Sequence, residues 1–320
     1  MVPRTLGLGL ALVVALTGCT PDTLAPVGTG TVGATSTATA SSSSGGVGGA
    51  GTSSSGVGTS GSGGASSSSG AGGATCGTAV DKPHDPTKAE WSYHDPSDGP
   101  TKWGTLMGDA TCGAGQAQTP IDLVDATAVG SAKPLVFSNY GKTVPVDLLD
   151  NGHTLQVNYA TTMSAEDPQI TYDGKTYYLL QFHWHSTSEH TMAGQASLFE
   201  AHFVHKAADG ALAVVGVLFD DGADNASLAR LMHDDPGHEK ESICSDGVKL
   251  DDLLPASRGF YHYSGSLTTP PCTEGLNWFV MMSPLQASAK QQAAYQTGFV
   301  GTTNRPIQPL DGRTVDKHAP

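Results

Sequence analysis

Two histidines stand two residues apart in the stretch Tyr178–His185, whose sequence is YLLQFHWH. Its apolar and aromatic residues predict a β-strand, and side chains alternate between the two faces of a strand. Gln181, His183 and His185 therefore share one face. Two imidazoles at this spacing can converge on one metal ion.

A second expected strand, Leu198–His205, offers a third imidazole, because Glu200 and His202 share one of its faces. If the two strands pair antiparallel, His202 faces the first pair of histidines. Three protein ligands with an open fourth position form the pattern of a catalytic zinc site, whereas structural sites are closed by four ligands. Gln181 and Glu200 suit the task of holding the other ring nitrogens of these ligands, which fixes ring orientation.

A different ligand set is also open. The pattern His183-x-His185-x-x-x-Glu189 resembles the first metal-binding motif of the cupins, in which His, His and Glu all bind metal. That motif also requires a glycine seven residues after the glutamate, where this chain has Ala196. The second cupin motif is absent at the usual spacing. Glu189 is therefore the alternative to His202 as third ligand.

The elements that must position these residues are mostly short strands. Apolar or alternating runs recur between Gly, Pro, Asp and Asn residues, a pattern typical of β domains. The expected strands are Thr143–Leu149, Thr154–Tyr159, Gln169–Tyr172, Tyr177–His185, Ser197–His205, Leu212–Phe219 and Asn277–Ser283. Helices are expected at Ala226–His233 and Gln286–Gly298. The sequence thus predicts a mainly β fold.

The composition divides the 320 residues into two unlike parts. All Phe, Tyr and Trp lie from Trp91 onward, and no charged residue lies between Asp22 and Asp81. Residues 81–320 carry the whole net charge of −14, which argues against nucleic-acid binding because that requires a basic face. This part is long enough for one large domain with its own core. After the N-terminus, no apolar run reaches the roughly 18 residues of a transmembrane helix.

The first residues are typical of an exported protein. Arg4 precedes an apolar run that ends in Leu16-Thr17-Gly18-Cys19, which resembles a bacterial lipobox. In such signals the chain is cut before the cysteine and the cysteine is lipidated. We therefore expect residues 1–19 to be a lipoprotein signal and Cys19 to anchor the protein in a membrane, most simply the outer membrane. Residues 20–80, rich in Gly, Ser, Thr and Ala, should form a disordered tether to a folded domain at 81–320.

Several motifs occur in order along residues 90–313. The longest is SGSLTTPPCTEG at 264–275. Shorter ones are QTPID at 118–122, NGH at 151–153, SEHT at 188–191 and NRPIQP at 304–309. Together they resemble the signature segments of the alpha-class carbonic anhydrases. This resemblance implies a large central, mostly antiparallel twisted sheet with a few surface helices.

The same resemblance implies an activity and a cofactor. Alpha-class carbonic anhydrases reversibly hydrate carbon dioxide to bicarbonate and a proton by means of hydroxide bound to Zn²⁺. His183, His185 and His202 match the zinc ligands of this family. Thr268 matches the threonine that orients the hydroxide, and Glu189 matches the glutamate that accepts the proton of the threonine hydroxyl.

Further positions match the proton shuttle and the substrate pocket of the family. His153 matches the shuttle, and an imidazole with an unperturbed pKa near 6.5 can accept and release protons near neutrality. Carbon dioxide is small and has no net dipole, so its pocket should be apolar. The residues that match this pocket are Val204, Val214, Leu267 and Trp278, with Thr269 beside them.

The five cysteines agree with export, because disulfides persist in oxidising compartments. With Cys19 lipidated, four remain. Cys112 and Cys272 resemble the disulfide of bacterial and secreted family members, which would brace the threonine-bearing loop. Cys76 and Cys244 have no family counterpart, and whether they pair stays open.

Three functional hypotheses follow. The first is an active zinc enzyme that acts on carbon dioxide and bicarbonate, and the presence of all three zinc histidines favours it. The second is a non-catalytic carbonic-anhydrase-like surface binding module, and the third is a cupin-like metal enzyme with Glu189 as ligand. Whether the domain is a monomer or a homodimer stays open. Among the other histidines, we expect His190 and His205 to be structural and His94 and His318 to be solvated.

Overall fold

The computed structural model describes residues 91–106, 111–124, 133–233, 243–299 and 301–320, with side chains for all of these except residues 243–246. They belong to one of the two compact units into which the chain divides. The expected signal segment and tether, residues 1–80, lie outside the described residues. Within the described part, no helix combines the length and the apolar character needed to span a membrane.

Most strands join one 12-stranded sheet with the central order β11-β3-β4-β6-β9-β10-β13-β12-β15. Outside this path, β14 pairs with β10, and β5 pairs with β2 and β6. The strands are β2 (Val136–Ser138), β3 (Thr143–Asp150), β4 (Leu155–Asn158), β5 (Gln169–Tyr172), β6 (Lys175–His185), β9 (Phe199–Lys206), β10 (Leu212–Asp221), β11 (Ile243–Lys249), β12 (Phe260–Ser266), β13 (Glu274–Met281), β14 (Leu285–Ala287) and β15 (Asp316–His318). Neighbours are antiparallel, except that β10 runs parallel to β13 and β14. The sheet is therefore mixed but mostly antiparallel, as the family resemblance implies.

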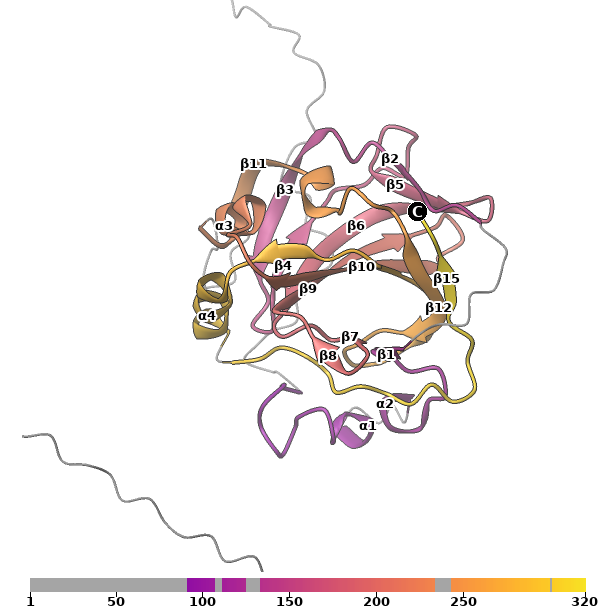
Figure 1. The fold of residues 1–320 in the computed structure, drawn as a ribbon, viewed down its shortest axis with the longest axis vertical. Helices are drawn as coiled ribbons and strands as arrows, with labels where there is room; N and C mark the ends of the chain where they lie inside the picture. The colour runs from indigo at the N-terminus through magenta and orange to yellow at the C-terminus, as the bar shows by residue number, and fades with distance from the viewer. Residues whose placement is uncertain (1–90, 107–110, 125–132, 234–242, 300) are drawn as a thin grey trace, which may run out of the picture. The chain divides into compact units, whose positions relative to one another are not determined.

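Short elements surround this sheet (Figure 1). A separate three-stranded sheet contains β1 (Asp122–Leu123), β7 (Thr191–Met192) and β8 (Gln195–Ala196). The helices are α1 (Trp103–Leu106), α2 (Thr111–Ala114), α3 (Ala226–His233), the 3-10 helix η2 (Leu250–Leu253) and α4 (Ala289–Gly298). Figure 1 shows α3 and α4 together at one side, with α1 and α2 beyond the small sheet. The fold is thus mainly β with few helices, as expected.

Both faces of the central strands are buried. Along β9, Phe199 and Phe203 point into the larger hydrophobic cluster of the protein. The alternate residue Val204 belongs to a second cluster, where it packs with Val214 and Trp278. A strand covered on both sides reads as a nearly continuous apolar run, which is the pattern of β9. The few polar residues on this strand are therefore placed in a dry environment.

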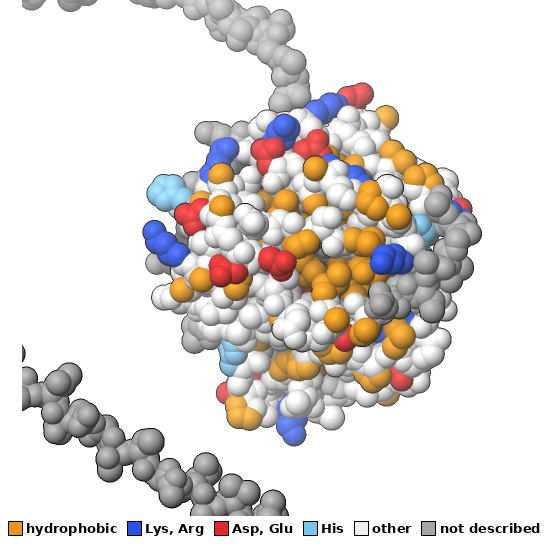
Figure 2. Space-filling model, in the orientation of Figure 1, with side chains coloured by type: hydrophobic (Ala, Val, Ile, Leu, Met, Phe, Trp, Pro, Cys, Tyr) orange, Lys and Arg blue, Asp and Glu red, His pale blue; other side chains and the backbone are white. Residues whose placement is uncertain are grey.

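Hydrophobic side chains also reach the surface. On the face seen in Figure 1, they gather near the centre, in front of β10 (Figure 2). Acidic and basic side chains are scattered over this face, some of them next to the hydrophobic group, and neither sign of charge forms a continuous patch there.

The expected strand positions agree closely with the structure, but one helix begins later than expected. The first residues of the predicted helix Gln286–Gly298 lie in β14, and α4 begins at Ala289. Ser288 sets this boundary with a capping box. Its hydroxyl accepts a hydrogen bond from the backbone N–H of Gln291 at 3.2 Å, and its own backbone N–H donates to Oε1 of Gln291 at 3.2 Å.

Two of the longer strands, β11 and β12, are missing from the sequence prediction, as are the short strands β1, β2, β7, β8, β14 and β15. In β11 the pairing with β3 shifts register between Ser245 and Val248, and Gly247 has a φ of +112°. A bulge of this kind breaks the strict alternation that reveals a strand in a sequence. β12 also shifts register against β13, at Ser266.

Candidate metal centre and active site

The three histidines predicted as ligands meet where β6 and β9 pair. The two strands are antiparallel, and His183 lies directly opposite His202 in the register. His185 follows two residues later on the same face. One ring nitrogen from each histidine lies within 4.8 Å of the other two. The side chains of His185 and His202 are 1% and 2% exposed, so bulk water does not solvate these rings.

Hydrogen bonds fix which nitrogen of the first two rings faces the cluster. Nδ1 of His183 donates to Oε1 of Gln181 at 2.8 Å, and Nδ1 of His185 donates to the carbonyl oxygen of Thr303 at 2.6 Å. A neutral imidazole carries one proton, so Nε2 of each ring keeps a free lone pair. Among the described residues, the buried Nε2 of His185 has no hydrogen-bond partner.

Glu200 orients the third ring. Its Oε1 lies 3.0 Å from Nε2 of His202 and 2.6 Å from Nδ1 of His190, while Oε2 accepts from the backbone N–H of Glu189 and of His190 at 2.9 and 2.8 Å. Burial acts to raise the pKa of Glu200, but the neighbouring His190 and His202 hold that pKa well below its usual range. The charged carboxylate thereby leaves Nδ1 of His202 available to the cluster.

The three imidazoles are neutral at physiological pH. Burial lowers the pKa of His183 and of His202, and it lowers the pKa of His185 to about 4. Deprotonated imidazole is the form that binds a metal ion. Three neutral nitrogen donors that converge on one point therefore fit a divalent transition metal with a fourth position left open.

Glu189 and Thr268 lie beside the cluster. Glu189 is 1% exposed, and its Oε1 accepts a hydrogen bond from the backbone N–H of Arg305 at 2.8 Å. Burial raises the pKa of Glu189 to about 7, against the lowering effects of His202, the Arg305 N–H and the Thr268 hydroxyl. The Thr268 side chain is itself buried, so this hydroxyl and this carboxyl interact away from bulk water.

The alternative ligand set with Glu189 is not assembled. Its oxygens lie 3.6 Å from Nδ1 of His185 and 3.8 Å from Nδ1 of His202, and Nδ1 of His185 is already bound to the carbonyl of Thr303. Within the described part of the chain, no cluster of three or more ligand atoms includes Glu189. The contacts of this carboxylate are instead with Arg305 and Thr268.

His153 lies in the turn between β3 and β4. The Asn151 side chain shapes this turn, because its Oδ1 accepts from the backbone N–H of His153 and of Thr154, each at 2.9 Å. The imidazole stacks on Trp91, with ring centroids 3.8 Å apart. The ring of Tyr93 lies 6.4 Å from the ring of His153 and 6.4 Å from that of His185. An aromatic side chain therefore stands between the turn and the histidine cluster.

The residues predicted for the substrate pocket line the same face of the sheet as His202. Val204, Val214 and Trp278 are cross-strand neighbours on β9, β10 and β13. The Trp278 ring centroid lies 4.8 Å from that of His202, and Leu267 packs on this cluster. Thr269 is half-buried in the loop after β12, and its carbonyl accepts from the Cys272 N–H at 2.8 Å. Val204, Val214, Leu267 and Trp278 thus form an apolar surface beside His202.

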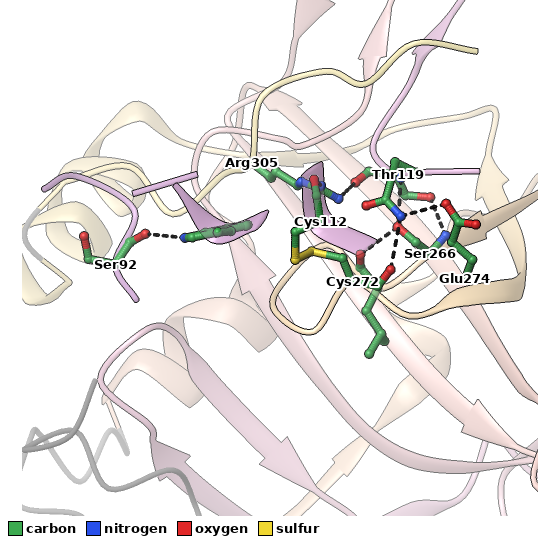
Figure 3. Close-up of a disulfide and its surroundings, with 10 residues drawn as sticks. Ser92, Cys112, Thr119, Ser266, Cys272, Glu274 and Arg305 are labelled. Carbon is green, nitrogen blue, oxygen red and sulfur yellow. Dashed lines mark hydrogen bonds between the residues drawn. A yellow bond between two sulfur atoms is a disulfide. The ribbon is translucent and has the colours of Figure 1, made fainter. Parts of the chain in front are cut away.

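A disulfide between Cys112 and Cys272 joins α2 to the loop that carries Thr268. Polar contacts surround it (Figure 3). The Gln118 amide donates to the Cys272 carbonyl at 3.1 Å, and the Arg305 guanidinium donates to the Cys112 carbonyl at 3.0 Å. The expected disulfide is therefore present. Cys76, the Cys244 side chain and Cys19 lie outside the described residues.

The other histidines are mostly structural. His190 is buried and bonds the Tyr263 hydroxyl at 2.6 Å, and His205 is buried against the hydroxyl of Tyr140. Both agree with the prediction, whereas His318 does not. Only 6% of His318 is exposed, because the pairing of β15 with β12 places its ring on Phe260, with ring centroids 4.4 Å apart.

Two contacts of the site could not be recognised from residue types. Thr303 and Arg305 act here through a backbone carbonyl and a backbone N–H, which other residues also carry. The neighbouring NRPIQP motif at 304–309 is the only sequence signal near them.

Known proteins share this architecture. A model of the eukaryotic-type carbonic anhydrases matches residues 98–319. The chain belongs to the alpha-class carbonic anhydrases. It is 39% identical to a carbonic anhydrase of Klebsiella pneumoniae over 229 residues, which cover 71% of this chain and 90% of that protein.

Solved alpha-class carbonic anhydrases agree in fold. The Photobacterium profundum alpha-carbonic anhydrase is 39% identical with a TM-score of 0.63, and the match covers 70% of this chain and 99% of that one. The alpha-carbonic anhydrase of Thermovibrio ammonificans, solved with the inhibitor sulfanilamide, is 37% identical with a TM-score of 0.65, over 71% and 98% of the two chains. The chain is therefore an enzyme of the carbonic anhydrase class, with carbon dioxide and bicarbonate as substrate and product. The cupin-like enzyme and the non-catalytic binding module are not favoured.

Proposed function

We propose that His183, His185 and His202 hold a catalytic Zn²⁺ and that carbon dioxide is hydrated beside it. The observation that carries this proposal is the convergence of three neutral imidazoles. In each ring, the nitrogen that points away from the cluster is contacted by an oxygen atom that orients the ring. Neutral donors leave the full charge of the ion available. When bound, zinc supplies the Lewis acidity that ionises water near neutral pH.

Thr268 directs the attacking oxygen. Its hydroxyl donates to the Glu189 carboxylate, which the Arg305 N–H holds in place. With its proton committed in this way, the Thr268 oxygen can only accept a hydrogen bond from the reacting water. This leaves one lone pair of the nucleophile pointing at the apolar pocket around Val204 and Trp278, where carbon dioxide would lie.

His153 moves the proton released in each cycle. Unperturbed imidazole titrates near pH 6.5, so it can take up a proton and release it to buffer. His153 is half-buried in its turn and so keeps contact with solvent. Its imidazole stacks on Trp91, which holds it near Tyr93, the aromatic residue between this turn and the three histidines.

Stopped-flow measurement of carbon dioxide hydration tests this function directly. We expect activity in the zinc-loaded protein, loss of activity after metal removal with a chelator, and recovery with added Zn²⁺. His202→Ala should lose both zinc and activity, while His94→Ala, at an exposed histidine, should keep both. A His202→Ala protein with full zinc content and full activity would show that another residue is the third ligand.

We also propose that the protein is exported and anchored through lipidated Cys19. The Leu16-Thr17-Gly18-Cys19 motif after a short apolar run supports this proposal. Mass spectrometry of the mature N-terminus should find an acylated cysteine, and Cys19→Ser should move the protein from the membrane fraction to the soluble fraction. Recovery of an unmodified, soluble wild-type protein would contradict the anchor.

A further inference from the structure

A second group of metal-binding side chains lies at the edge of the large sheet. It consists of His262 on β12 with Asp316 and His318 on the last strand, β15. One ligand atom of each residue lies within 4.8 Å of the other two. None of these three residues takes part in the carbon dioxide chemistry proposed above.

This group is on the opposite face of the sheet from the three-histidine centre. Trp278 packs beside His202, with ring centroids 4.8 Å apart. Its neighbour on β13, Phe279, points the other way into the larger hydrophobic cluster. His262 stacks on Phe279, with ring centroids 5.0 Å apart. Because side chains alternate along a strand, the sheet itself separates the two groups.

The strand register brings the three side chains together. β15 pairs antiparallel with β12, so Asp316 lies opposite His262 and His318 lies opposite Phe260. The Asp316 Oδ2 atom is 3.6 Å from His262 Nδ1. Zinc bonds of about 2.0–2.2 Å in a tetrahedral site place ligand atoms about 3.4 Å apart, which is close to this separation.

A neighbouring side chain sets the tautomer of His262. The Nε2 of His262 donates to Oδ1 of Asn277 at 3.1 Å, so Nδ1 carries the lone pair of the ring. This lone pair faces the Asp316 carboxylate, which is also an electron-pair donor. The Tyr172 hydroxyl donates a long hydrogen bond of 3.4 Å to the same Nδ1, and a bound cation would replace this contact. A cation between His262 and Asp316 would satisfy both acceptors.

The third member of the group, His318, has a buried ring nitrogen without a hydrogen-bond partner among the described residues. This nitrogen is Nε2, and the side chain is 6% exposed. A buried polar atom without a partner is costly unless a ligand satisfies it. Burial lowers the pKa of His318, which keeps the ring in the neutral form that binds metal. Asp316 is 34% exposed and leaves a path for an ion to enter.

We propose that His262, Asp316 and His318 form a second site for a divalent transition metal ion, which ties the last strand to the sheet. Two imidazoles and one carboxylate are a donor set that suits Zn²⁺. The site is independent of catalysis, because it lies on the other face of the sheet.

The number of zinc ions bound per chain tests this proposal. The purified protein is dialysed against a buffer with a fixed micromolar concentration of free Zn²⁺. The number of zinc ions bound per chain is then measured by inductively coupled plasma mass spectrometry. Three variants are compared with the wild type. His318→Phe keeps an aromatic ring beside Phe260, Asp316→Asn keeps the shape of a half-buried side chain, and His233→Gln removes an exposed histidine at the end of α3 as the matched control.

We expect His318→Phe and Asp316→Asn each to bind one zinc ion fewer than the wild type, and His233→Gln to bind the same number. Carbon dioxide hydration should be equal in all four proteins, which shows that the three-histidine centre is still loaded. The thermal midpoint of the wild type should rise with added Zn²⁺ more than that of Asp316→Asn. Equal zinc content in the wild type and Asp316→Asn would overturn the proposal, even if His318→Phe failed to fold.

Discussion

At the residue scale, hydrogen bonds hold each functional side chain of the site in one orientation. Gln181 and Glu200 hold ring nitrogens of His183 and His202, and the Arg305 N–H holds Glu189. Removal of a group that orients a metal ligand or a reacting atom typically costs roughly 10–100-fold in activity or metal affinity. Single substitutions should therefore separate metal binding from turnover.

Glu189→Gln should lower kcat/KM for carbon dioxide by roughly 10–100-fold and leave the zinc content unchanged. The amide oxygen can still accept from the Arg305 N–H, but the amide NH₂ then faces Thr268 and turns its hydroxyl round. Stopped-flow kinetics and metal analysis measure the two quantities. Glu166→Gln, at an exposed carboxylate, is the control. Loss of zinc from the Glu189 variant would instead indicate a ligand role.

His153→Ala should lower kcat in dilute buffer by about 10²-fold, the usual contribution of a positioned proton-transfer group. Its kcat/KM and zinc content should stay unchanged, because the imidazole stacks on Trp91 and is not in the histidine cluster. Concentrated imidazole buffer should restore turnover. If kcat in dilute buffer were the same in both proteins, His153 would not be the shuttle.

At the scale of elements, the pairing of β6 with β9 and the turns between strands hold these side chains in place. The loop between β4 and β5 is built around the buried Asp167. Its carboxylate accepts from the Tyr159 hydroxyl at 2.9 Å, and from the backbone N–H of Thr162 and of Ser164, each at 2.9 Å. Burial acts to raise the pKa of Asp167, but these hydrogen bonds outweigh it and hold the pKa below its ordinary value.

Asp167→Asn should therefore lower the free energy of unfolding by about 1–3 kcal/mol at neutral pH, because donors that now face a carboxylate would face an amide NH₂. A carboxyl with a lowered pKa in the folded state stabilises the fold above its unfolded pKa of about 3.9. This contribution is lost as pH falls through the folded value. The difference between wild type and variant should thus shrink in acid.

Urea denaturation over a range of pH measures this difference. Asp209→Asn is the matched control, since Asp209 pairs with Lys175 on the surface, where solvent screens such pairs and they contribute little to stability. A gap between wild type and Asp167→Asn that stayed constant from neutral pH into acid would contradict the role of the charge.

At the scale of the whole molecule, the disulfide joins two positions that are 160 residues apart. A cross-link that closes a long loop restricts the unfolded chain, and its removal typically costs about 2–5 kcal/mol. The Cys112→Ser/Cys272→Ser protein should lose that much unfolding free energy in guanidinium titrations. A reductant should lower the stability of the wild type by more than that of the double variant. Equal stability of the two oxidised proteins would show that the bridge contributes nothing.

The sequence by itself determined much of the active site. The two-residue period of a strand put Gln181, His183 and His185 on one face, and the SGSLTTPP motif marked the loop that carries Thr268. These inferences succeed because they depend only on residue types and on the spacing of residues that are close together in the sequence. The order of the motifs along the chain likewise indicated the family and the mostly antiparallel sheet.

Only the tertiary structure decided which distant groups meet. The carbonyl of Thr303 and the N–H of Arg305 reach the site through the backbone, so no side-chain type marks them. His262 and His318, on strands far apart in the sequence, come together because β15 pairs with β12 in one register. Register and strand order depend on the packing of the whole sheet, and no short stretch of sequence contains that information.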